Sequence, residues 1–560
     1  MYVRRIWRTN ADGSRTGYLQ LAHKVRDPES GMPRDKVLHH FGREDQIDQA
    51  QLKRLIKSIS RFLEPGEREP IGANHLGNAQ DMSVERSLRY GGSYVLGALW
   101  KRLELDRVLK RLLSERDYAI DIERLLFALV ANRALDPRSK LGVERWVGQH
   151  VAIDELESVQ VHALYRAMDF LIEHDEAIQK AVFFSTASLL NLEVDLLFFD
   201  TTTSYFEIEQ EDEGEDALRR FGRPSKDHRK DRPQVVIGLA VTRSGIPVRC
   251  WTWPGNTADA SVVEEVQADL ASWRLNRVVW VMDRGMAGAE QRATLQRGGG
   301  HVIVGEKLRS AEAAVVEAIS RSGRYKRVRD NVEVKEVIVE NGSDKRRYVV
   351  VRNPQQTERD EQIRTAIVER VEAEIKRLNA QLKAKKRPQA HTKAVCALKA
   401  HQTMGRYVRE LKSGQLRLNR GAVKDQARFD GKYLLSTTDP SLSAADVALG
   451  YKQLLDVERA FRTLKSTLEL RPMHHRKPDR IRAHVILCWL ALLLVRVAEN
   501  ESGATWDRLR DELEQIHLVD LRSKDGRFRM ASAVTPEQRK ALSSLGIRPP
   551  KRLQETTLTL

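Results

Sequence analysis

A short apolar run that ends on a carboxylate places the strongest constraint on how this chain folds. Residues 195–207 read DLLFFDTTTSYFE, so four apolar residues, Leu196 to Phe199, lead directly into Asp200. Such a run is typical of a strand that is buried on both faces of a sheet. A buried carboxylate without a partner costs several kcal/mol or takes up a proton. We therefore expect a cation beside Asp200, and a metal ion is the commonest strong partner.

The segments that follow this run indicate an α/β layer. Two strand-like segments, 233–242 and 246–254, flank a Ser-Gly pair that is suited to a hairpin turn. Helical patterns then alternate with short apolar strands, at 258–274, 277–285, 287–297 and 301–307. This order predicts a mixed sheet whose first three strands are antiparallel and whose later strands are parallel.

The 560 residues are too many for one ordinary core, and changes of pattern divide them into six segments. We expect an N-terminal β-hairpin with a short helix (46–62) and a linker (1–82 in all), a helical domain (83–190), the first part of the sheet layer (191–307), an α+β insertion (308–445), a helical second part of the layer (446–515) and a C-terminal tail (516–560). The helical domain is expected either to bind DNA or only to pack against its neighbours.

The insertion has its own pattern of strands and helices. It should contain a hairpin around an Asn-Gly pair at 341–342, helices at 356–386 and 390–412, and a second hairpin at 427–438. The long helix at 356–386 has an apolar stripe, which suits either a coiled-coil arm or a helix packed on its own domain.

Charge and composition narrow the class of partner. The chain has 95 Lys and Arg against 78 Asp and Glu, a net charge of +17, which indicates a polyanion, nucleic acid first, although a merely basic soluble protein has the same balance. The three cysteines are far apart, so neither a disulfide framework nor a zinc site is expected, and a reducing cytoplasm fits. The longest apolar run, 485–495, is shorter than the ~20 residues of a membrane span. We expect a buried helix there and no membrane partner.

Two more acids extend the constraint set by Asp200. Asp283 ends the strand expected at 277–285, so the two carboxylates converge if their strands are neighbours. A third acid, Glu458, lies on an amphipathic helix expected at 450–472. Oxygen ligands of this kind suit a pair of Mg²⁺ ions, which can clamp a phosphodiester for in-line attack.

The helix at 450–472 carries polar residues in a regular spacing. Tyr451, Glu458 and Lys465 are seven residues apart, close to two helical turns, so they share one face. Such a face suits a metal and phosphate site. It also suits an ordinary solvated face with ion pairs such as Glu458–Arg462, worth ~0.3–0.5 kcal/mol.

Taken together, these motifs resemble the bacterial insertion-sequence transposases of the DDE type, in the branch with the signature Tyr-x2-Arg-x3-Glu-x6-Lys. The resemblance spans most of the chain in the family's order, through VLHHFGRED, FFDTTTSYFE, the stretch 225–259, VVWVMDRGMAG and the stretch 474–494. It implies a ribonuclease-H-like mixed sheet flanked by helices and interrupted by an α+β insertion. It also implies a transposase that cuts DNA at the element's ends and joins them to target DNA.

The resemblance assigns roles to particular residues. Asp200, Asp283 and Glu458 would bind two Mg²⁺ ions, with Mn²⁺ as a substitute, and Tyr451 and Lys465 would contact DNA phosphates. Leu454 stands where the signature has Arg, so we expect Arg459 or Arg462 to supply that charge. Lys226, in SKDHRKD, is expected on the active-site loop, or else in a solvated charged turn.

The resemblance also implies a DNA partner, and two other functions are compatible with the same sequence. Double-stranded DNA, as element ends and as target, is the expected partner, bound by a homodimer or larger assembly in the bacterial cytoplasm. A DNA-binding relic without activity would keep the basic charge, and a metal-dependent nuclease of the same fold would cut without joining. All three acids are present, which favours an active enzyme, and the insertion and the Tyr/Lys face favour a transposase over a plain nuclease.

Overall fold

The computed structural model describes residues 2–10, 15–26, 32–44, 82–114, 120–190, 196–222, 226–259, 261–273, 278–282, 289–297, 300–309, 312–341, 344–384, 388–523 and 526–558. The chain forms two compact units. The first comprises Met1–Val84, Leu521–Arg527 and Thr557–Leu560, and the second comprises Glu85–Asp520 and Phe528–Thr556.

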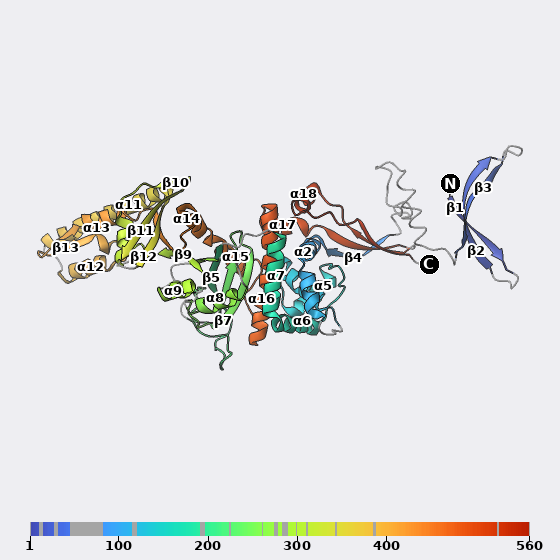
Figure 1. The fold of residues 1–560 in the computed structure, drawn as a ribbon, viewed down its shortest axis with the longest axis horizontal. Coiled ribbons are helices and arrows are strands. Elements are labelled where there is room, and N and C mark those ends of the chain that lie inside the picture. The colour runs from blue at the N-terminus through green and yellow to red at the C-terminus, as the bar shows by residue number, and fades with distance from the viewer. Residues whose placement is uncertain are drawn as a thin grey trace. The chain divides into compact units, whose positions relative to one another are not determined.

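The first unit contains a three-stranded antiparallel sheet in the order β1-β2-β3 (Figure 1). Its strands are β1 (Tyr2–Thr9), β2 (Arg15–Arg26) and β3 (Pro33–Arg43). The expected hairpin is confirmed as β2 and β3, and β1 is a further strand that the sequence did not predict. β1 was missed because most of its side chains are exposed, so it lacks an alternating apolar pattern. The helix at 46–62 and the linker that follows it lie outside the described residues.

The helical domain of the second unit contains six helices among its described residues. They are α2 (Gly91–Arg102), α3 (Leu105–Leu113), α4 (Ile122–Leu135), α5 (Lys140–Gln149), α6 (Val161–Glu173) and α7 (Asp175–Leu189). A later helix, α16 (Pro478–Ser502), packs against α4 and α6. α16 is long and apolar enough to cross a membrane, but 89% of its most apolar stretch is buried inside the protein. The expectation of a buried helix at 485–495 is confirmed.

A nine-stranded sheet forms the centre of the second unit, in the order β10-β11-β12-β15-β9-β8-β5-β6-β7 (Figure 1). Five of its strands come from the expected layer: β5 (Leu196–Tyr205), β6 (Gln234–Val241), β7 (Pro247–Pro254), β8 (Val279–Met282) and β9 (His301–Glu306). β5, β6 and β7 pair antiparallel, whereas β5, β8 and β9 pair parallel. The expected mixed sheet is confirmed. The helices α8 (Val263–Ala271) and α9 (Ala289–Arg297) alternate with these strands.

The strands of the insertion extend this same sheet. They are β10 (Lys326–Arg329), β11 (Val332–Asn341), β12 (Asp344–Arg352) and β15 (Lys432–Thr437), with α10 (Ala313–Ser320) beside them. The hairpin around 341–342 is confirmed as β11 and β12. The hairpin expected at 427–438 is wrong, because α13 (Arg420–Ala427) precedes a single strand, β15. β15 pairs with β12 on one side and with β9 on the other, and such distant partners leave no local signal.

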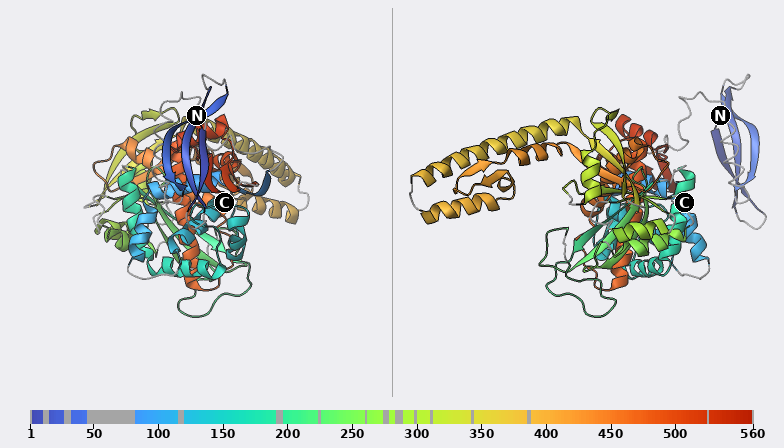
Figure 2. Two further views of the ribbon diagram at one scale, coloured as in Figure 1. Left: turned by 90° about the vertical axis from the view of Figure 1, so that its right-hand side faces the viewer. Right: turned by 60° about the vertical axis from the view of Figure 1, so that its left-hand side comes forward.

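Two long helices of the insertion form a helical hairpin, which we call the arm and define as residues 354–427. Figure 2 shows α11 (Pro354–Lys383) and α12 (Pro388–Ala400) running side by side. The arm also contains η5 (Gly405–Tyr407), β13 (Val408–Glu410), β14 (Leu416–Leu418) and α13. Its own apolar cluster, which includes Val371, Leu378 and Val395, shows that α11 packs on its own domain. The second helix ends at Ala400 rather than at 412. Shortly beyond it, Gly405 lies so close to Lys399 that a side chain there would sit 2.1 Å from the Lys399 carbonyl oxygen.

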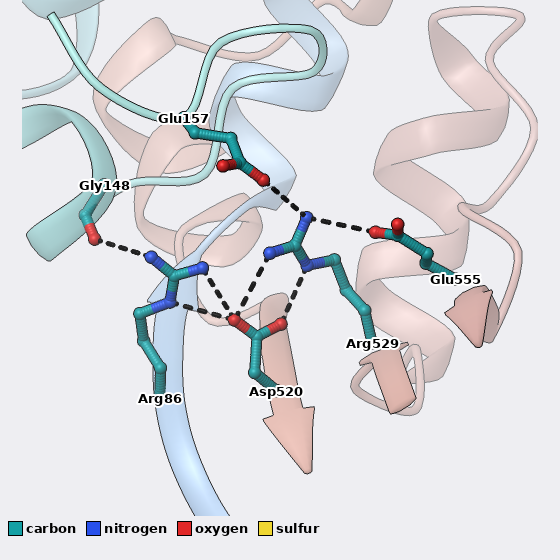
Figure 3. A network of polar contacts seen from close by, with 6 residues as sticks. All are labelled: Arg86, Gly148, Glu157, Asp520, Arg529 and Glu555. Atoms are coloured by element: carbon teal, nitrogen blue, oxygen red, sulfur yellow. Dashed lines mark hydrogen bonds and ion pairs between the residues drawn. The ribbon is translucent and has the colours of Figure 1, made fainter. Parts of the chain in front are cut away.

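The C-terminal residues are folded, so the expectation of a tail at 516–560 is wrong. They form β16 (His517–Ser523), β17 (Gly526–Ala531), α18 (Pro536–Ser544) and β18 (Leu553–Leu558), after α17 (Trp506–Leu513). β16 pairs with β4 (Ser83–Arg89), so the C-terminal strands share a sheet of order β18-β17-β16-β4 with a strand that precedes the helical domain. Figure 3 shows the ion pairs that join them: Arg86 and Arg529 both donate to Asp520, at 2.7 and 2.8 Å. Arg529 also lies 3.7 Å from Glu157 and 3.4 Å from Glu555.

Candidate active site

Asp200 lies in the middle of β5, in register with Leu239 of β6. Its side chain is 22% exposed, and its Oδ1 accepts a hydrogen bond from the Thr201 amide at 2.7 Å. Burial raises the pKa of Asp200 above its usual value, although the nearby Lys226 ammonium works in the opposite direction. The positive charge of Lys226 therefore does not fully offset the effect of burial on the Asp200 carboxylate.

The cation beside Asp200 in the structure is Lys226. Its Nζ lies 3.4 Å from Asp200 Oδ1 and 3.4 Å from Asp259 Oδ2. It also donates to the backbone oxygen of Thr201 at 2.6 Å and to Thr201 Oγ1 at 2.8 Å. Lys226 thus contacts Asp200 from a turn and is itself partly exposed to solvent.

Asp259 is a second acid beside Lys226, and it was missed from the sequence. Its Oδ1 accepts a hydrogen bond from Thr201 Oγ1 at 2.6 Å, so Thr201 and Lys226 both connect it to Asp200. Asp259 ends the stretch 225–259, which carries part of the resemblance, and that position was the available signal. No spacing rule links it to Asp200, because it follows β7 rather than a strand next to β5.

Glu458 lies on α15 (Leu454–Ser466), which packs on β5. Asp200 and Glu458 line the same cavity, of about 410 Å³, together with Asn331, Val332, Asn353, Tyr433, Tyr451, Lys452, Leu454 and Leu455. The Glu458 side chain is exposed. The structure therefore brings two of the three predicted acids to one cavity. The third, Asp283, lies outside the described residues, directly after the last residue of β8.

The predicted helix at 450–472 is two helices, and in this respect the prediction is wrong. α14 (Ala444–Lys452) ends before Gln453, and α15 then ends at Ser466. Tyr451 is therefore on α14, whereas Glu458 and Lys465 are on α15. The seven-residue spacing of Tyr451, Glu458 and Lys465 is the same with or without a break at Gln453, so this spacing did not reveal the break.

Tyr451 reaches the cavity because Gly305 of β9 leaves room for its hydroxyl. A β-carbon at position 305 would lie 2.2 Å from Tyr451 Oη. The Tyr451 ring is also held near Tyr433, with ring centroids 6.0 Å apart. Gly305 and Tyr433 thus set the position of Tyr451.

Lys465 is engaged within the protein. Its Nζ donates to Asp227 Oδ1 at 2.7 Å, and Arg471 lies 2.6 Å from the same oxygen. Asp227 is 5% exposed and Lys465 is 14% exposed. Burial lowers the pKa of Lys465, while the bond to Asp227 works against that shift.

The two arginines proposed to replace the signature Arg are both exposed on α15. Arg459 pairs with Asp456 at 3.1 Å, whereas the Arg462 side chain points to solvent. Leu454, which stands at the signature position, begins α15 and lines the cavity.

The donor set of this cavity fits a hard divalent cation. Asp200 and Glu458 offer carboxylate oxygens, the ligands that Mg²⁺ prefers. Burial already disfavours the charge of Asp200, so a cation there would be stabilising. Within the described ranges, which leave out Asp283, no cluster of three or more His, Cys, Asp or Glu side chains forms a metal cage.

Comparisons with known proteins give the family of the chain. The family described as transposase DDE domain matches residues 195–494, more than half of the chain. The family described as IS1634 family transposase, N-terminal domain, matches residues 3–70. No curated protein matches the sequence significantly. Among solved structures, the chain is similar to the piggyBac transposase synaptic complex with hairpin DNA, at 10% identity and a TM-score of 0.33, over 75% of this chain and 79% of that one. That likeness is too low to define the fold.

Proposed function

The chain belongs to the DDE transposases, and from this premise we propose that it cuts DNA at the terminal inverted repeats of an insertion sequence and joins the ends to target DNA. As a DDE transposase it is an enzyme of DNA cleavage and transposition. The observation that carries the finer proposal is the shared cavity of Asp200 and Glu458, because these acids come from distant parts of the sequence.

We propose that the core is ribonuclease-H-like and that Asp283 completes the triad. The strand order β9-β8-β5-β6-β7, with parallel and antiparallel halves, supports such a core. Phe198 pairs with Val281 in the parallel β5–β8 ladder, and Asp200 and Asp283 each follow these residues by two positions. Side chains two positions apart lie on the same face of a strand. The register of β5 and β8 therefore supports an arrangement in which both acids meet at one sheet edge.

Asp200, Asp283 and Glu458 would hold two Mg²⁺ ions, or Mn²⁺ in their place, which supply positive charge to the phosphodiester under attack. Lys226 would then supply a smaller part of the positive charge beside Asp200, and it would keep its contacts with Asp259 and Thr201. The Lys226 ammonium favours the ionised form of Asp200, which a divalent cation would need as a ligand, and Asp259 holds Lys226 beside it.

The DNA phosphates would be bound by residues around the cavity. Tyr451 lines it, and Arg459 and Arg462 extend from α15 into solvent, where either can replace the arginine missing at Leu454. Lys465 would contact a phosphate by exchanging Asp227 for it. The DNA-bound protein is proposed to be a homodimer or larger, since two element ends must be joined.

The test is a reaction on a DNA fragment that ends in the element's own terminal repeat, with a plasmid as target and Mg²⁺ present. Asp283→Asn and Glu458→Gln should abolish both nicking and joining. Glu469→Gln, an exposed acid just beyond α15, is the matched control and should keep both activities. Nicking without joining in the unaltered protein would instead indicate a nuclease, and binding with neither reaction would indicate a relic.

A further inference from the structure

We propose that the arm is a second DNA-binding surface, which holds the phosphate backbone of duplex DNA without reading its sequence. Much of the excess of Lys and Arg over Asp and Glu lies in one part of the arm, residues 376–420. Residues 376–420 contain thirteen lysines and arginines and a single acid, Glu410, so these 45 residues carry +12 of the net charge of +17. The inference deepens the proposed function, because it assigns part of the expected DNA contact to a named surface.

The cations of this segment face solvent. The ten that the structure describes are all exposed: Lys376, Arg377, Lys383, Lys393, Lys399, Arg406, Arg409, Lys412, Arg417 and Arg420. In the described part of the arm, the acids that pair with them are Glu374, with Arg377, and Glu410, with Lys399. The apolar side chains meet inside the hairpin, so the basic surface has no need of a covering protein domain.

A cavity at the base of the arm continues the basic surface. It has a volume of about 800 Å³, and Lys307, Arg309, Arg406 and Lys432 are among its lining residues. Its two acids are engaged within the protein: Asp430 pairs with Arg364 at 2.6 Å, and Asp360 accepts the Gly431 amide at 2.8 Å. The remaining side-chain charge of the cavity is positive.

Duplex DNA fits this surface better than other partners do. Clustered like charges repel one another, and a polyanion removes that cost while releasing its own counterions. α12, which lies wholly within the basic segment, is about 20 Å long at 1.5 Å per residue, which matches about 6 base pairs at 3.4 Å each. Single-stranded nucleic acid is held by stacking on aromatic side chains. The one aromatic residue of the arm, Tyr407, is buried, and the cavity at its base adds only the half-buried Phe429, so the surface offers no row of exposed aromatic rings.

The experiment compares two variants of the full chain that each lack four exposed cations. The arm variant combines Lys376→Gln, Lys393→Gln, Arg409→Gln and Arg417→Gln. The control variant combines Arg508→Gln, Arg539→Gln, Lys540→Gln and Lys551→Gln, which lie between α17 and β18. Binding to a duplex without terminal repeats is measured over a range of salt concentrations. Circular dichroism first establishes that both variants keep their helical content.

In the arm variant, the slope of log affinity against log salt should become shallower by up to about 3.6, because each phosphate that is no longer neutralised reduces the slope by about 0.9. The control variant should keep the slope of the unaltered protein. An unchanged slope in the arm variant, an equal change in both variants, or stronger competition by single-stranded nucleic acid than by duplex would overturn the proposal. The assay needs no cleavage, so a protein that binds through the arm but never nicks DNA would refute the proposed function alone.

Discussion

Asp227 accepts a hydrogen bond from Lys465 at 2.7 Å, and this contact fastens the loop that follows β5 to the helix that carries Glu458. The residue before it, Lys226, contacts Asp200. Two consecutive residues of opposite charge therefore connect the strand acid to the helix acid. We infer that Lys226 and Asp227 fix the positions of the two halves of the α/β layer relative to each other. The insertion separates these halves in sequence.

Asp227→Asn should loosen that connection. The change leaves Lys465 and Arg471 without a buried counter-charge, and hydrogen bonds to charged groups are worth about 1.5–3 kcal/mol each. We expect a decrease of roughly that size in the free energy of unfolding, measured by denaturant titration, and slower DNA cleavage. Asp231→Asn is the matched control, because Asp231 lies in the same loop with a side chain that is 62% exposed. Equal decreases in the two variants would contradict the role given to Asp227.

Asp200→Asn should stabilise the metal-free protein while removing its response to metal. Burial raises the folded-state pKa of Asp200, so the folded protein binds more protons than the unfolded chain just above the usual carboxyl pKa. Stability from this group is therefore lost as pH rises through that window, and the ionised group destabilises the fold at neutral pH. Thermal unfolding should show a higher Tm for Asp200→Asn without Mg²⁺.

In the same experiment, added Mg²⁺ should raise the Tm of the unaltered protein and leave that of Asp200→Asn unchanged. Asp212→Asn, in the loop after β5 and paired with Arg219, serves as the control and should respond to Mg²⁺ normally. A metal response that survives in Asp200→Asn would place the metal elsewhere.

Lys140→Met should stabilise the helical domain in a pH-dependent way. Burial, followed by the charge of Arg133, lowers the pKa of Lys140 from 10.5 to about 7. The unfolded chain thus binds more protons than the folded protein between these values, and this contribution to stability rises with pH from about 7 to 10.5. The variant should be more stable than the unaltered protein below pH 7, and the difference should disappear near pH 10.5, as measured by denaturant titration. The exposed Lys540→Met should show no such trend.

Gly305→Ala should displace Tyr451 from the cavity. The new methyl group would overlap the tyrosine hydroxyl, so we expect weaker DNA cleavage with little change in secondary structure. Gly421→Ala is the control, since the nearest atom to its methyl group would be 3.4 Å away. Adding Tyr451→Phe to Gly305→Ala should recover part of any decrease in stability but not the activity. Full activity in Gly305→Ala would show that the position of Tyr451 does not matter.

The parts of the site that sequence reasoning predicted depend on local chemistry. A charge at the end of the buried run around Phe199 requires a partner, and the structure provides one in Lys226. Glu458 was predicted from its helix face, and it lies in the same cavity as Asp200. The predicted place of Asp283 remains a prediction.

The parts that were missed depend on contacts between distant residues. Asp227 and Lys465 meet although 238 positions separate them, and Asp259 follows a strand that is not adjacent to β5. β15 was read as half of a hairpin because both of its neighbours come from earlier in the chain. Local pattern and propensity contain no information on such pairs.

The position of β15 in the middle of the sheet has a consequence for synthesis. β9 emerges from the ribosome long before Thr437, yet β15 is the strand that joins it to β12. The sheet therefore stays in two pieces through translation of the whole insertion, and Glu458 arrives later still. A chain truncated inside the insertion would contain β5 to β9 but would lack both β15 and Glu458.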